Sequence, residues 1–372
     1  MADRKVCHFF DAMHIASLKT TNFRNLNGVE LQFVPEVNVF HGLNGSGKTN
    51  LLEALHVCCL GKSQRGAQDQ TMVRSQTDVY RLECALQEDD RRKEVAVAAQ
   101  RGGRKKVEID GVTSRLRDLY EQFQVVSVGP EDSEIVAGSP SNRRGFLDIY
   151  ISQRSARYLS TLSDYQRCLQ QRNAALKAQT DPSPFDDLFI DLGVRVMTQR
   201  AEFVTAIKPL ACDHYARISG GGSFDVSYAP SVAVDSSDED TWADSFGLKL
   251  AEISHREAAY GSSLAGPHRD DVVLTVNDHP ARTHASQGEC RTAAISLKLA
   301  AYHVLKEDRG LAPILLLDEI FAELDDRRTG ALIEAFADFG QLFLTTATDP
   351  PHALANSGRA FEISNGQVSE VR

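Results

Sequence analysis

The stretch GLNGSGKT has the spacing G-x-x-x-x-G-K-[ST] and lies between the apolar run VNVF and the helical pattern NLLEALHVC. In this order of strand, loop and helix, glycines let backbone N–H groups surround phosphates, and the helix adds the positive end of its dipole. We name residues 42–49 the phosphate loop. We expect Lys48 to reach the β- and γ-phosphates of a nucleotide and Thr49 to hold Mg²⁺. The other expected nucleotide contacts are Gly42, Leu43, Asn44, Gly45, Ser46 and Gly47.

Two adjacent acids end a second apolar run, ILLLDE, from Ile314 to Glu319. Asp318 is suited to the Mg²⁺ shell, and Glu319 is suited to accept a proton from an attacking water. The plainer alternative is that the pair merely caps a buried strand. Two acids in that position are costly without a cation, so we favour the catalytic interpretation.

A third motif, SQGE, begins the long helical pattern that precedes the acidic run. Within one subunit a second helix N-terminus that attracts phosphate has no role, because the phosphate loop already holds the nucleotide. It has a role if Ser286, Gln287 and Gly288 cap the γ-phosphate bound by another copy. The sequence therefore indicates an ATP-dependent homodimer.

The elements that must position these motifs form three zones. Residues 14–138 alternate apolar and polar positions around one helix, and residues 263–372 alternate strands with helices. Residues 139–262 are mainly helical. We expect an α/β fold with a mixed sheet, interrupted by an inserted α-helical arm. Residues 1–13 precede this pattern and are expected to form a disordered extension.

The helical zone contains an apolar seam with heptad spacing, followed by a break at TDPSPFDD and a second apolar stripe. A short antiparallel helical hairpin is one interpretation, and two helices lying on a globular core is the other. The seam consists of Tyr158, Leu162, Tyr165, Leu169 and Leu176, and the second stripe of Leu188, Leu192, Val196, Phe203, Ile207 and Leu210.

Composition excludes several classes of protein. The chain has 372 residues, of which 42% are hydrophobic and 25% charged, with a net charge of −10. No apolar run approaches the roughly 20 residues that cross a bilayer, and the N-terminus lacks a secretion signal. The seven cysteines contain no C-x-x-C pair, so we expect reduced thiols and a cytoplasmic protein. The negative charge follows residue 150, so DNA would have to meet a local basic patch.

The motif SQGE resembles the signature of ABC-type ATPases, and FAELD, from Phe321 to Asp325, resembles the D-loop that follows their acidic strand. Within that class the chain is similar to the RecF family of bacterial DNA repair and replication proteins over nearly all of residues 14–372. The similarity rests on four further stretches, which are NFRNL (22–26), GLNGSGKTNLLEAL (42–55), GPEDSEIVAGSPSNRRGFLD (129–148) and GPHRDD (266–271).

This resemblance implies an ABC-type ATPase head that dimerises on binding ATP and Mg²⁺. It also implies binding to double-stranded DNA near single-strand gaps and, with RecO and RecR, help in loading RecA during repair, replication restart and the SOS response. Arg24 and Asn25 would lie near the nucleotide, and residues 286–288 would form the signature that acts on the other copy. Gln124 is the candidate for the glutamine that senses Mg²⁺, although Gln122 is equally near the PED stretch.

Two departures from the ABC pattern predict a weak ATPase that serves as a switch. Glu289 replaces the usual glutamine at the end of the signature and places a negative charge near the phosphate site of the other copy. The segment TTATD offers Thr348 or Asp349 where many ABC-type ATPases have a histidine. Without an imidazole on the γ-phosphate, slow turnover is the expectation.

The densest basic run, RGGRKK, falls on an expected hairpin turn. Its charged residues are the DNA-binding candidates, and they are Arg101, Arg104, Lys105 and Lys106. Arg143 and Arg144 are more simply solvated or salt-bridged, and we interpret the stretch around His268 as a loop joining arm to head. Transporter and tether ATPases are disfavoured, because the chain has a helical insertion but no long coiled coil. The alternative function is a nucleotide switch in another DNA or protein complex.

Overall fold

The computed structural model describes residues 13–88, 91–232, 239–322, 326–336, 339–347 and 358–371. By internal packing the chain divides into two units, Met1–Asp132 with Ala301–Arg372, and Ser133–Ala300. The sequence-based division of the chain into an N-terminal head part (14–138), an arm (139–262) and a C-terminal head part (263–372) stays a prediction. Three sequence expectations lie outside the described residues: the extension before Met13, the D-loop residues 323–325, and the TTATD positions Thr348 and Asp349.

The first unit contains a sheet in the order β15-β14-β3-β13-β12-β8, in which β14 through β8 run parallel and β15 pairs antiparallel with β14. All five residues of β12 are buried, as a parallel strand covered on both faces requires. The parallel sheet expected from runs such as ILLL is therefore confirmed. Its strands are β3 (Val37–His41), β8 (Val125–Val128), β12 (Ile314–Asp318), β13 (Leu342–Thr346), β14 (Gly358–Ser364) and β15 (Gln367–Val371).

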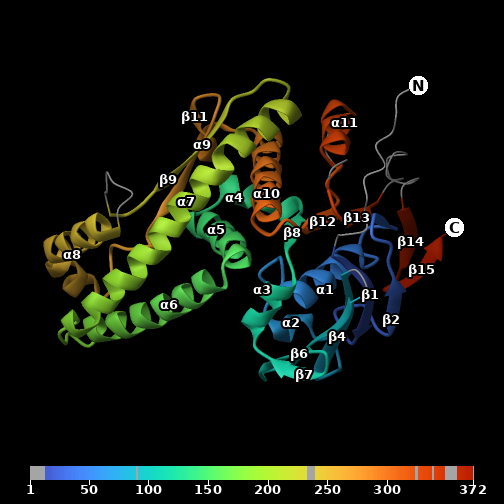
Figure 1. Ribbon diagram of the computed structural model, residues 1–372, viewed down its shortest axis with the longest axis horizontal. Helices are drawn as coiled ribbons and strands as arrows, with labels where there is room; N and C mark the ends of the chain where they lie inside the picture. The colour runs from blue at the N-terminus through green and yellow to red at the C-terminus, as the bar shows by residue number, and fades with distance from the viewer. Residues whose placement is uncertain are drawn as a thin grey trace. The chain divides into compact units, whose positions relative to one another are not determined.

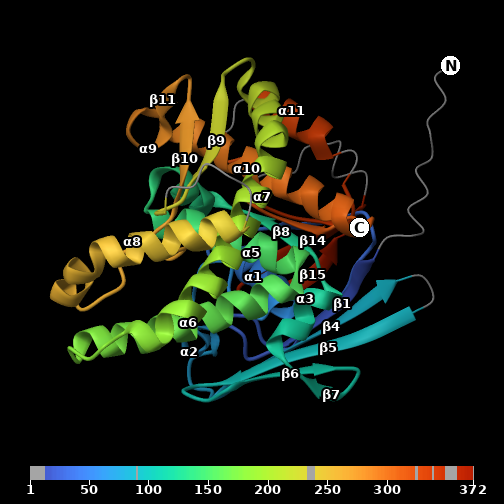
Figure 2. The ribbon, with the colours of Figure 1, turned by 60° about the vertical axis from the view of Figure 1, so that its left-hand side comes forward.

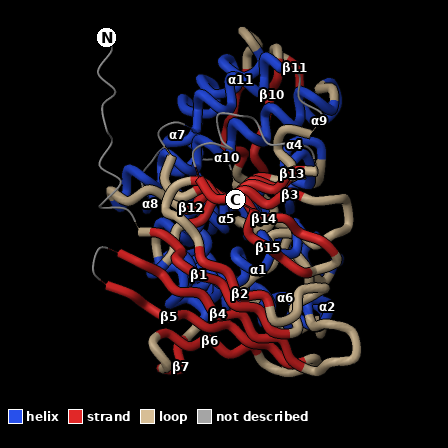
Figure 3. Tube along the Cα trace, turned by 90° about the vertical axis from the view of Figure 1, so that its right-hand side faces the viewer, coloured by secondary structure: helices blue, strands red, loops and turns tan. Residues whose placement is uncertain are grey.

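A second, antiparallel sheet in the same unit has the order β2-β1-β4-β5-β6-β7 and forms the single layer seen in Figure 3. Alternate residues of β2 and of β1 from Leu18 onward are buried, which matches the half-exposed pattern of the sequence; the alternation in β1 is interrupted by a register shift between Ile15 and Ser17. The strands are β1 (His14–Thr21), β2 (Val29–Gln32), β4 (Val79–Glu88), β5 (Arg91–Gln100), β6 (Lys105–Ile109) and β7 (Val112–Ser114).

Helix α1 (Lys48–Leu60) packs against strands of both sheets, with β12 and β13 from one and β4 and β5 from the other (Figure 1). It is buried nearly all round, which explains why its sequence shows no clear polar face. Glu53 and His56 are buried in it and therefore need polar partners. The short helices of this unit are α2 (Asp69–Met72), η2 (Leu116–Asp118), α3 (Leu119–Gln122), η3 (Pro130–Asp132) and α11 (Asp326–Ala335).

The second unit contains the expected helical hairpin, α6 (Ala156–Lys177) and α7 (Asp186–Ser219), joined through η4 (Ser183–Phe185). A third helix, α8 (Glu239–Tyr260), packs on both, so the three lie side by side in Figure 2. Helix α8 was not expected from the sequence, and with it the arm is a three-helix bundle rather than a hairpin alone. Leu188, expected in the second apolar stripe, is exposed instead.

The remainder of this unit is a three-stranded antiparallel sheet with helices around it. Strand β10 (Asp271–Val276) pairs with β9 (Phe224–Ala229) and with β11 (His279–Pro280). The helices are α4 (Ser133–Ala137), α5 (Pro140–Arg154) and α9 (Ala281–His284), and α10 (Gln287–Arg309) begins here and ends in the first unit.

These elements confirm the predicted α/β class with a mixed sheet and an inserted helical region. Among the described residues, no helix combines the length and apolar character that crossing a membrane requires.

Candidate nucleotide-binding site

The phosphate loop connects the carboxyl end of β3 to the start of α1, as predicted. Gly42 has φ 154°, and a Cβ there would lie 2.3 Å from the carbonyl oxygen of Ile363. Gly47 has φ 121°, and a Cβ there would lie 2.8 Å from the Asn25 side chain. A side chain at either position would have a strained backbone and would clash with the neighbouring residue. Both positions therefore require glycine.

A cavity of about 730 Å³ is lined by the first residues of the loop and by the end of β14. Its volume is in the usual range of small-molecule sites. Within it, the Ser46 hydroxyl is buried and has no hydrogen-bond partner among the described residues. The lining residues are His41, Gly42, Leu43, Asn44, Gly45, Ser46, Ala347, Glu362, Ile363, Ser364 and Asn365.

The Lys48 side chain is 3% exposed, and its cation is held inside the loop. Its Nζ donates to the carbonyl oxygens of Gly42 at 2.8 Å and Leu43 at 3.1 Å, and lies 3.1 Å from Oε1 of Glu319. A phosphate oxygen is a suitable replacement for the Glu319 carboxylate, because both are anionic acceptors. The ammonium is therefore positioned to exchange one anion for another.

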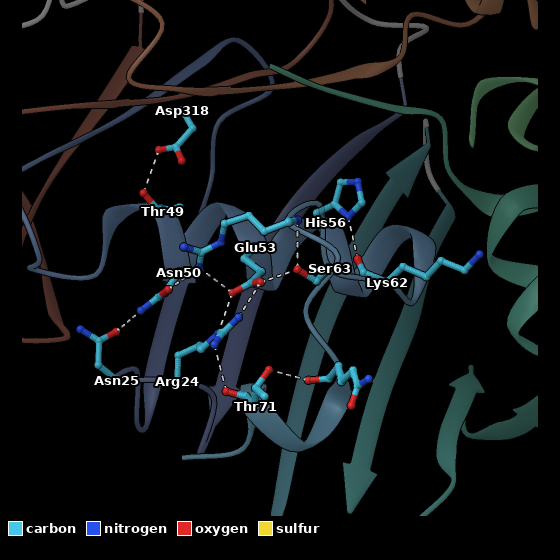
Figure 4. Close-up of polar contacts among 12 residues, drawn as sticks. Arg24, Asn25, Thr49, Asn50, Glu53, His56, Lys62, Ser63, Thr71 and Asp318 are labelled. Atoms are coloured by element: carbon cyan, nitrogen blue, oxygen red, sulfur yellow. Dashed lines mark hydrogen bonds and ion pairs between the residues drawn. The ribbon is translucent and has the colours of Figure 1, made fainter. Parts of the chain in front are cut away.

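Thr49 and Asp318 meet although they are far apart in sequence, and Figure 4 shows the contact, with Thr49 Oγ1 donating to Asp318 Oδ1 at 3.1 Å. Thr345 Oγ1 donates to the same carboxylate oxygen at 2.6 Å. Burial raises the pKa of Asp318; the two hydroxyls oppose this rise, and the nearby carboxylates of Glu131 and Glu319 add to it. A hydroxyl and a crowded carboxylate are the oxygen ligands that fit Mg²⁺.

Glu319 follows β12 with φ 47°, a conformation that non-glycine residues adopt mainly at constrained sites. Its backbone N–H donates to Thr345 Oγ1 at 3.0 Å, and its side chain is 25% exposed. The carboxylate is thus fixed at the strand end and still reachable by water, as a proton acceptor must be.

Gln124 is not part of this group, which contradicts the predicted role of its side chain as a Mg²⁺ ligand. Its carbonyl oxygen accepts from the Ile314 N–H at 2.8 Å, which places it at the amino end of β12, opposite the end that carries Asp318. Glu131, which the sequence analysis missed, lies at the correct end. A Cβ on Gly129 would be 3.2 Å from Glu131 Oε2 and 3.6 Å from Asp318 Cβ. The parallel register of β8 with β12 is the signal that places it there.

Asn25 contacts the phosphate loop directly, whereas the Arg24 side chain points to Glu53, and Figure 4 shows Asn25 beside Asn50 and Arg24 beside Glu53. Asn25 Nδ2 donates to the Ser46 carbonyl oxygen at 3.1 Å, and its Oδ1 accepts from Asn50 Nδ2 at 2.8 Å. The Arg24 guanidinium turns to the Glu53 carboxylate instead. Asn25 therefore braces the loop, and the expected contact of Arg24 with the nucleotide stays a prediction.

The signature residues lie in the second unit, where Glu289 is folded back onto Ser286. Both the N–H and the Oγ of Ser286 donate to Glu289 Oε2 at 2.8 Å. Asn277 Nδ2 donates to the other carboxylate oxygen at 3.2 Å. Glu289 thus occupies two of the donors that the signature would offer to a phosphate, while Gln287 is exposed and Gly288 half-buried.

The basic turn lies between β5 and β6, as expected, but most of its cations have protein partners. Arg101 donates to three backbone carbonyls between Gln70 and Arg74, Lys105 pairs with Asp69 and also donates to Gly61, and Lys106 pairs with Glu108. Arg104 is exposed, and in the part of the chain that the structure describes it has no ion pair.

The paired arginines of the second unit follow the plainer of the two interpretations. Arg143 is buried and bonded to Asp271 through both Nε, at 2.6 Å, and Nη2, at 3.0 Å. Arg144 donates to the Asp270 carbonyl oxygen at 2.8 Å. Both cations are therefore tied to the GPHRDD stretch.

Comparisons with known proteins agree with this arrangement. The family model described as the RecF/RecN/SMC N-terminal domain matches residues 14–367. The chain is 37% identical to the DNA replication and repair protein RecF of Halalkalibacterium halodurans and 34% identical to that of Bacillus subtilis, each over 96% of this chain and the whole relative.

Solved structures give the same result. A structure of the recombination mediator protein RecF-ATP in the RecFOR pathway is 28% identical, with a TM-score of 0.91 over 98% of this chain and the whole of that one. The Smc head domain of Pyrococcus furiosus, at 16% identity and a TM-score of 0.54 over 96% of both chains, shares the fold. The chain therefore belongs to the RecF/RecN/SMC N-terminal domain family and, within it, to the RecF proteins of DNA replication and repair.

Proposed function

We propose that the chain binds ATP with Mg²⁺ at the phosphate loop and that ATP joins two copies into a clamp on DNA. The observation that carries this proposal is the meeting of Thr49 with Asp318 beside the Lys48–Glu319 ion pair. These four side chains come from one helix start and one strand end, since Lys48 and Thr49 open α1 and Asp318 and Glu319 lie at the end of β12. Together they supply a cation that binds phosphate, two metal ligands and a proton acceptor.

The chemistry follows from the partners that these residues now have. When phosphates enter, Lys48 exchanges the Glu319 carboxylate for phosphate oxygens, which releases Glu319 to orient a water and accept its proton. Thr49 and Asp318 would hold Mg²⁺, which neutralises charge on the phosphates. Turnover is expected to be slow, so hydrolysis would reset the clamp rather than drive continuous work.

Dimerisation would come from residues 286–288 of one copy capping the γ-phosphate held by the other. In that arrangement each site needs both copies, so nucleotide binding and association depend on one another. The Glu289 contact with Ser286 would have to open first, since it engages both donors of that serine.

The proposed roles in DNA binding and in a repair pathway rest on the similarity of the chain to its relatives. By similarity to the RecF mediator of the RecFOR pathway, we propose binding to double-stranded and gapped DNA and cooperation with RecO- and RecR-type proteins in the cytoplasm to load RecA. Because the other cations of the basic turn have protein partners, Arg104 is the residue of this turn that is best placed to contact a DNA phosphate. If DNA does not promote assembly, the second candidate is a nucleotide switch in another complex.

Sedimentation velocity with ATP, ADP or no nucleotide, each with and without duplex DNA, tests the proposal. We expect the protein to dimerise with ATP but not with ADP or without nucleotide. We also expect more duplex DNA to sediment with the protein in ATP than under the other two conditions. Mixing Ser286→Arg with Lys48→Met sharpens the test, because a heterodimer would keep one intact composite site. Some heterodimer should form in ATP where neither variant dimerises by itself; the absence of any dimer in all mixtures would refute the shared site.

A further inference from the structure

Glu53 lies in α1, in the helix that begins with Lys48, and its side chain is completely buried. A buried carboxylate is unfavourable unless it is paired and hydrogen-bonded. Glu53 accepts four donors: Nε and Nη2 of Arg24 at 2.8 and 2.9 Å, Nη2 of Arg65 at 2.9 Å, and Oγ of Ser63 at 2.5 Å. The paired fork of Arg24 is the geometry that gives the strongest ion pairs.

These partners keep the carboxylate charged. Burial alone raises the pKa of Glu53, but the hydrogen bonds from Arg24, Ser63 and Arg65 outweigh it, so the pKa lies below its ordinary value. One anion thus holds two cations from separate segments, the first before β2 and the second after α1.

From this centre a chain of hydrogen bonds leads to the phosphate loop, and Figure 4 shows its link between Asn50 and Asn25. Arg65 Nη2 donates to Asn50 Oδ1 at 2.9 Å, and Asn50 Nδ2 donates to Asn25 Oδ1 at 2.8 Å. Asn25 Nδ2 donates to the Ser46 carbonyl oxygen at 3.1 Å. Each amide has its orientation fixed by the next partner, so the end of the chain defines where the loop backbone lies.

Arg24 fixes the same stretch from its other side. Its Nη1 donates to the Thr71 carbonyl oxygen at 2.9 Å, and its backbone N–H donates to the Met72 carbonyl oxygen at 2.8 Å. Arg24 also has φ 52°, an uncommon conformation for a side chain of this size. Glu53 therefore restrains both the residue before Asn25 and, through Asn50, the Asn25 side chain itself.

We propose that Glu53 is a positioning residue of the nucleotide site, one that presets the phosphate loop through Arg24, Arg65, Asn50 and Asn25. The inference rests on the proposed function, because the loop must bind ATP for its preset geometry to matter. Preorganised contacts strengthen binding by removing the cost of ordering the site. Losing Glu53 would therefore weaken ATP binding without removing any group that touches phosphate.

The test is the dissociation constant of Mg²⁺-ATP, measured by calorimetry, together with the melting temperature of each variant. Glu53→Gln removes the charge and most of the acceptor capacity, and we expect ATP to bind about 10-fold more weakly. Glu257→Gln is the matched control, since Glu257 is 1% exposed and pairs with Arg172 at 2.8 Å in the second unit. It should lower the melting temperature similarly and leave ATP affinity within about twofold.

Arg65→Gln provides a second route that does not depend on a buried substitution, because Arg65 is 29% exposed. We expect a loss of about 5-fold in ATP affinity, and little further loss when it is combined with Glu53→Gln, since both act through Asn50. Glu53→Asp keeps the charge and should recover part of the affinity.

Two results separate the inference from the proposed function. If Lys48→Met loses ATP binding while Glu53→Gln and Arg65→Gln both bind within about twofold of the wild-type affinity, the positioning role is refuted and the site stands. If the wild-type protein does not bind ATP, the proposed function itself fails. Should Glu53→Gln not fold, the Arg65→Gln affinity decides the question alone.

Discussion

Two charged clusters stand out in the molecule, and they differ in how their groups are satisfied. In the first unit, the phosphate loop has a buried Ser46 hydroxyl with no partner among the described residues, and a Lys48 cation paired with a partly exposed carboxylate. In the second unit, residues 266–271, which we name the joint, are bonded to protein groups throughout.

The polar side chains of the joint have hydrogen-bond partners within the protein. Arg200 donates to Asp148 and to the Pro267 carbonyl oxygen at 2.8 and 2.6 Å. His268 lies between Tyr165 Oη at 2.6 Å and the Ser263 carbonyl oxygen at 3.0 Å, and Asp270 accepts from Tyr228 and Ser231.

A charged motif can be interpreted from the partners of its charges. Each stretch has a basic side chain close to a carboxylate, with Lys48 beside Glu319 in the first and Arg269 next to Asp270 in the second. Where each charge has a fixed partner, the motif stabilises the fold; where a cation faces an anion that a ligand can replace, the motif binds. The variants below should therefore separate stability from nucleotide affinity.

The largest expected effect comes from Arg200→Met in α7, because the Arg200 side chain donates to the joint at the Pro267 carbonyl oxygen. Removing the cation leaves the Pro267 carbonyl oxygen and the Asp148 carboxylate without their strongest donor, at a cost of about 3–5 kcal/mol in the free energy of unfolding. Denaturant unfolding would measure this loss. ATP affinity of the folded protein should stay unchanged, and a large fall in affinity would show that the joint serves the nucleotide site.

Lys48→Met should give the opposite result. It removes charge-assisted contacts to phosphate, so ATP affinity should fall on the order of 10²-fold and ATP-dependent DNA binding should be lost with it. The melting temperature should change little, because Glu319 is partly exposed and keeps access to water. Wild-type DNA affinity of this variant in ATP would mean that DNA binding does not depend on the clamp.

The joint should also respond to pH through His268. Burial, with Arg269, Arg144 and Arg172 nearby, lowers the pKa of His268 to about 4. The unfolded histidine takes up a proton as pH falls through 6.5, whereas the folded one does so only near 4. The free energy of unfolding should therefore fall by about 2–3 kcal/mol over that window.

His268→Gln has no titrating group at this position and serves as the control. Its unfolding free energy should fall less steeply between pH 6.5 and 4 than that of the wild-type protein. Equal slopes for the two proteins would show that the imidazole is not held neutral in the fold.

The smallest expected effect is that of Glu289→Gln. A neutral amide caps Ser286 less strongly than the carboxylate and carries no charge that repels phosphate. Association in ATP should therefore strengthen by about 3-fold, as measured by the midpoint of a light-scattering titration. Unchanged or weaker association would show that the contact between Glu289 and Ser286 is not a brake.

The sequence predicts the structure best where a motif and the elements that flank it are adjacent in the chain. The run ILLLD predicts a buried parallel strand, and the phosphate loop predicts its flanking strand and helix, because both patterns are local. Gln124 was misplaced because nearness to the PED stretch in sequence does not tell which end of a strand a residue occupies. Glu131 and the Glu53 network depend on strand register and on contacts between distant segments, which spacing does not contain.

The central claim is that ATP assembles two copies around shared sites, and Glu319→Gln tests it most directly. The substitution keeps the phosphate and metal contacts but removes the proton acceptor, so hydrolysis should fall on the order of 10²-fold or more. Sedimentation velocity at saturating ATP and micromolar protein should then show a stable dimer that remains on duplex DNA. A monomer under those conditions would contradict the clamp and leave a monomeric switch in its place.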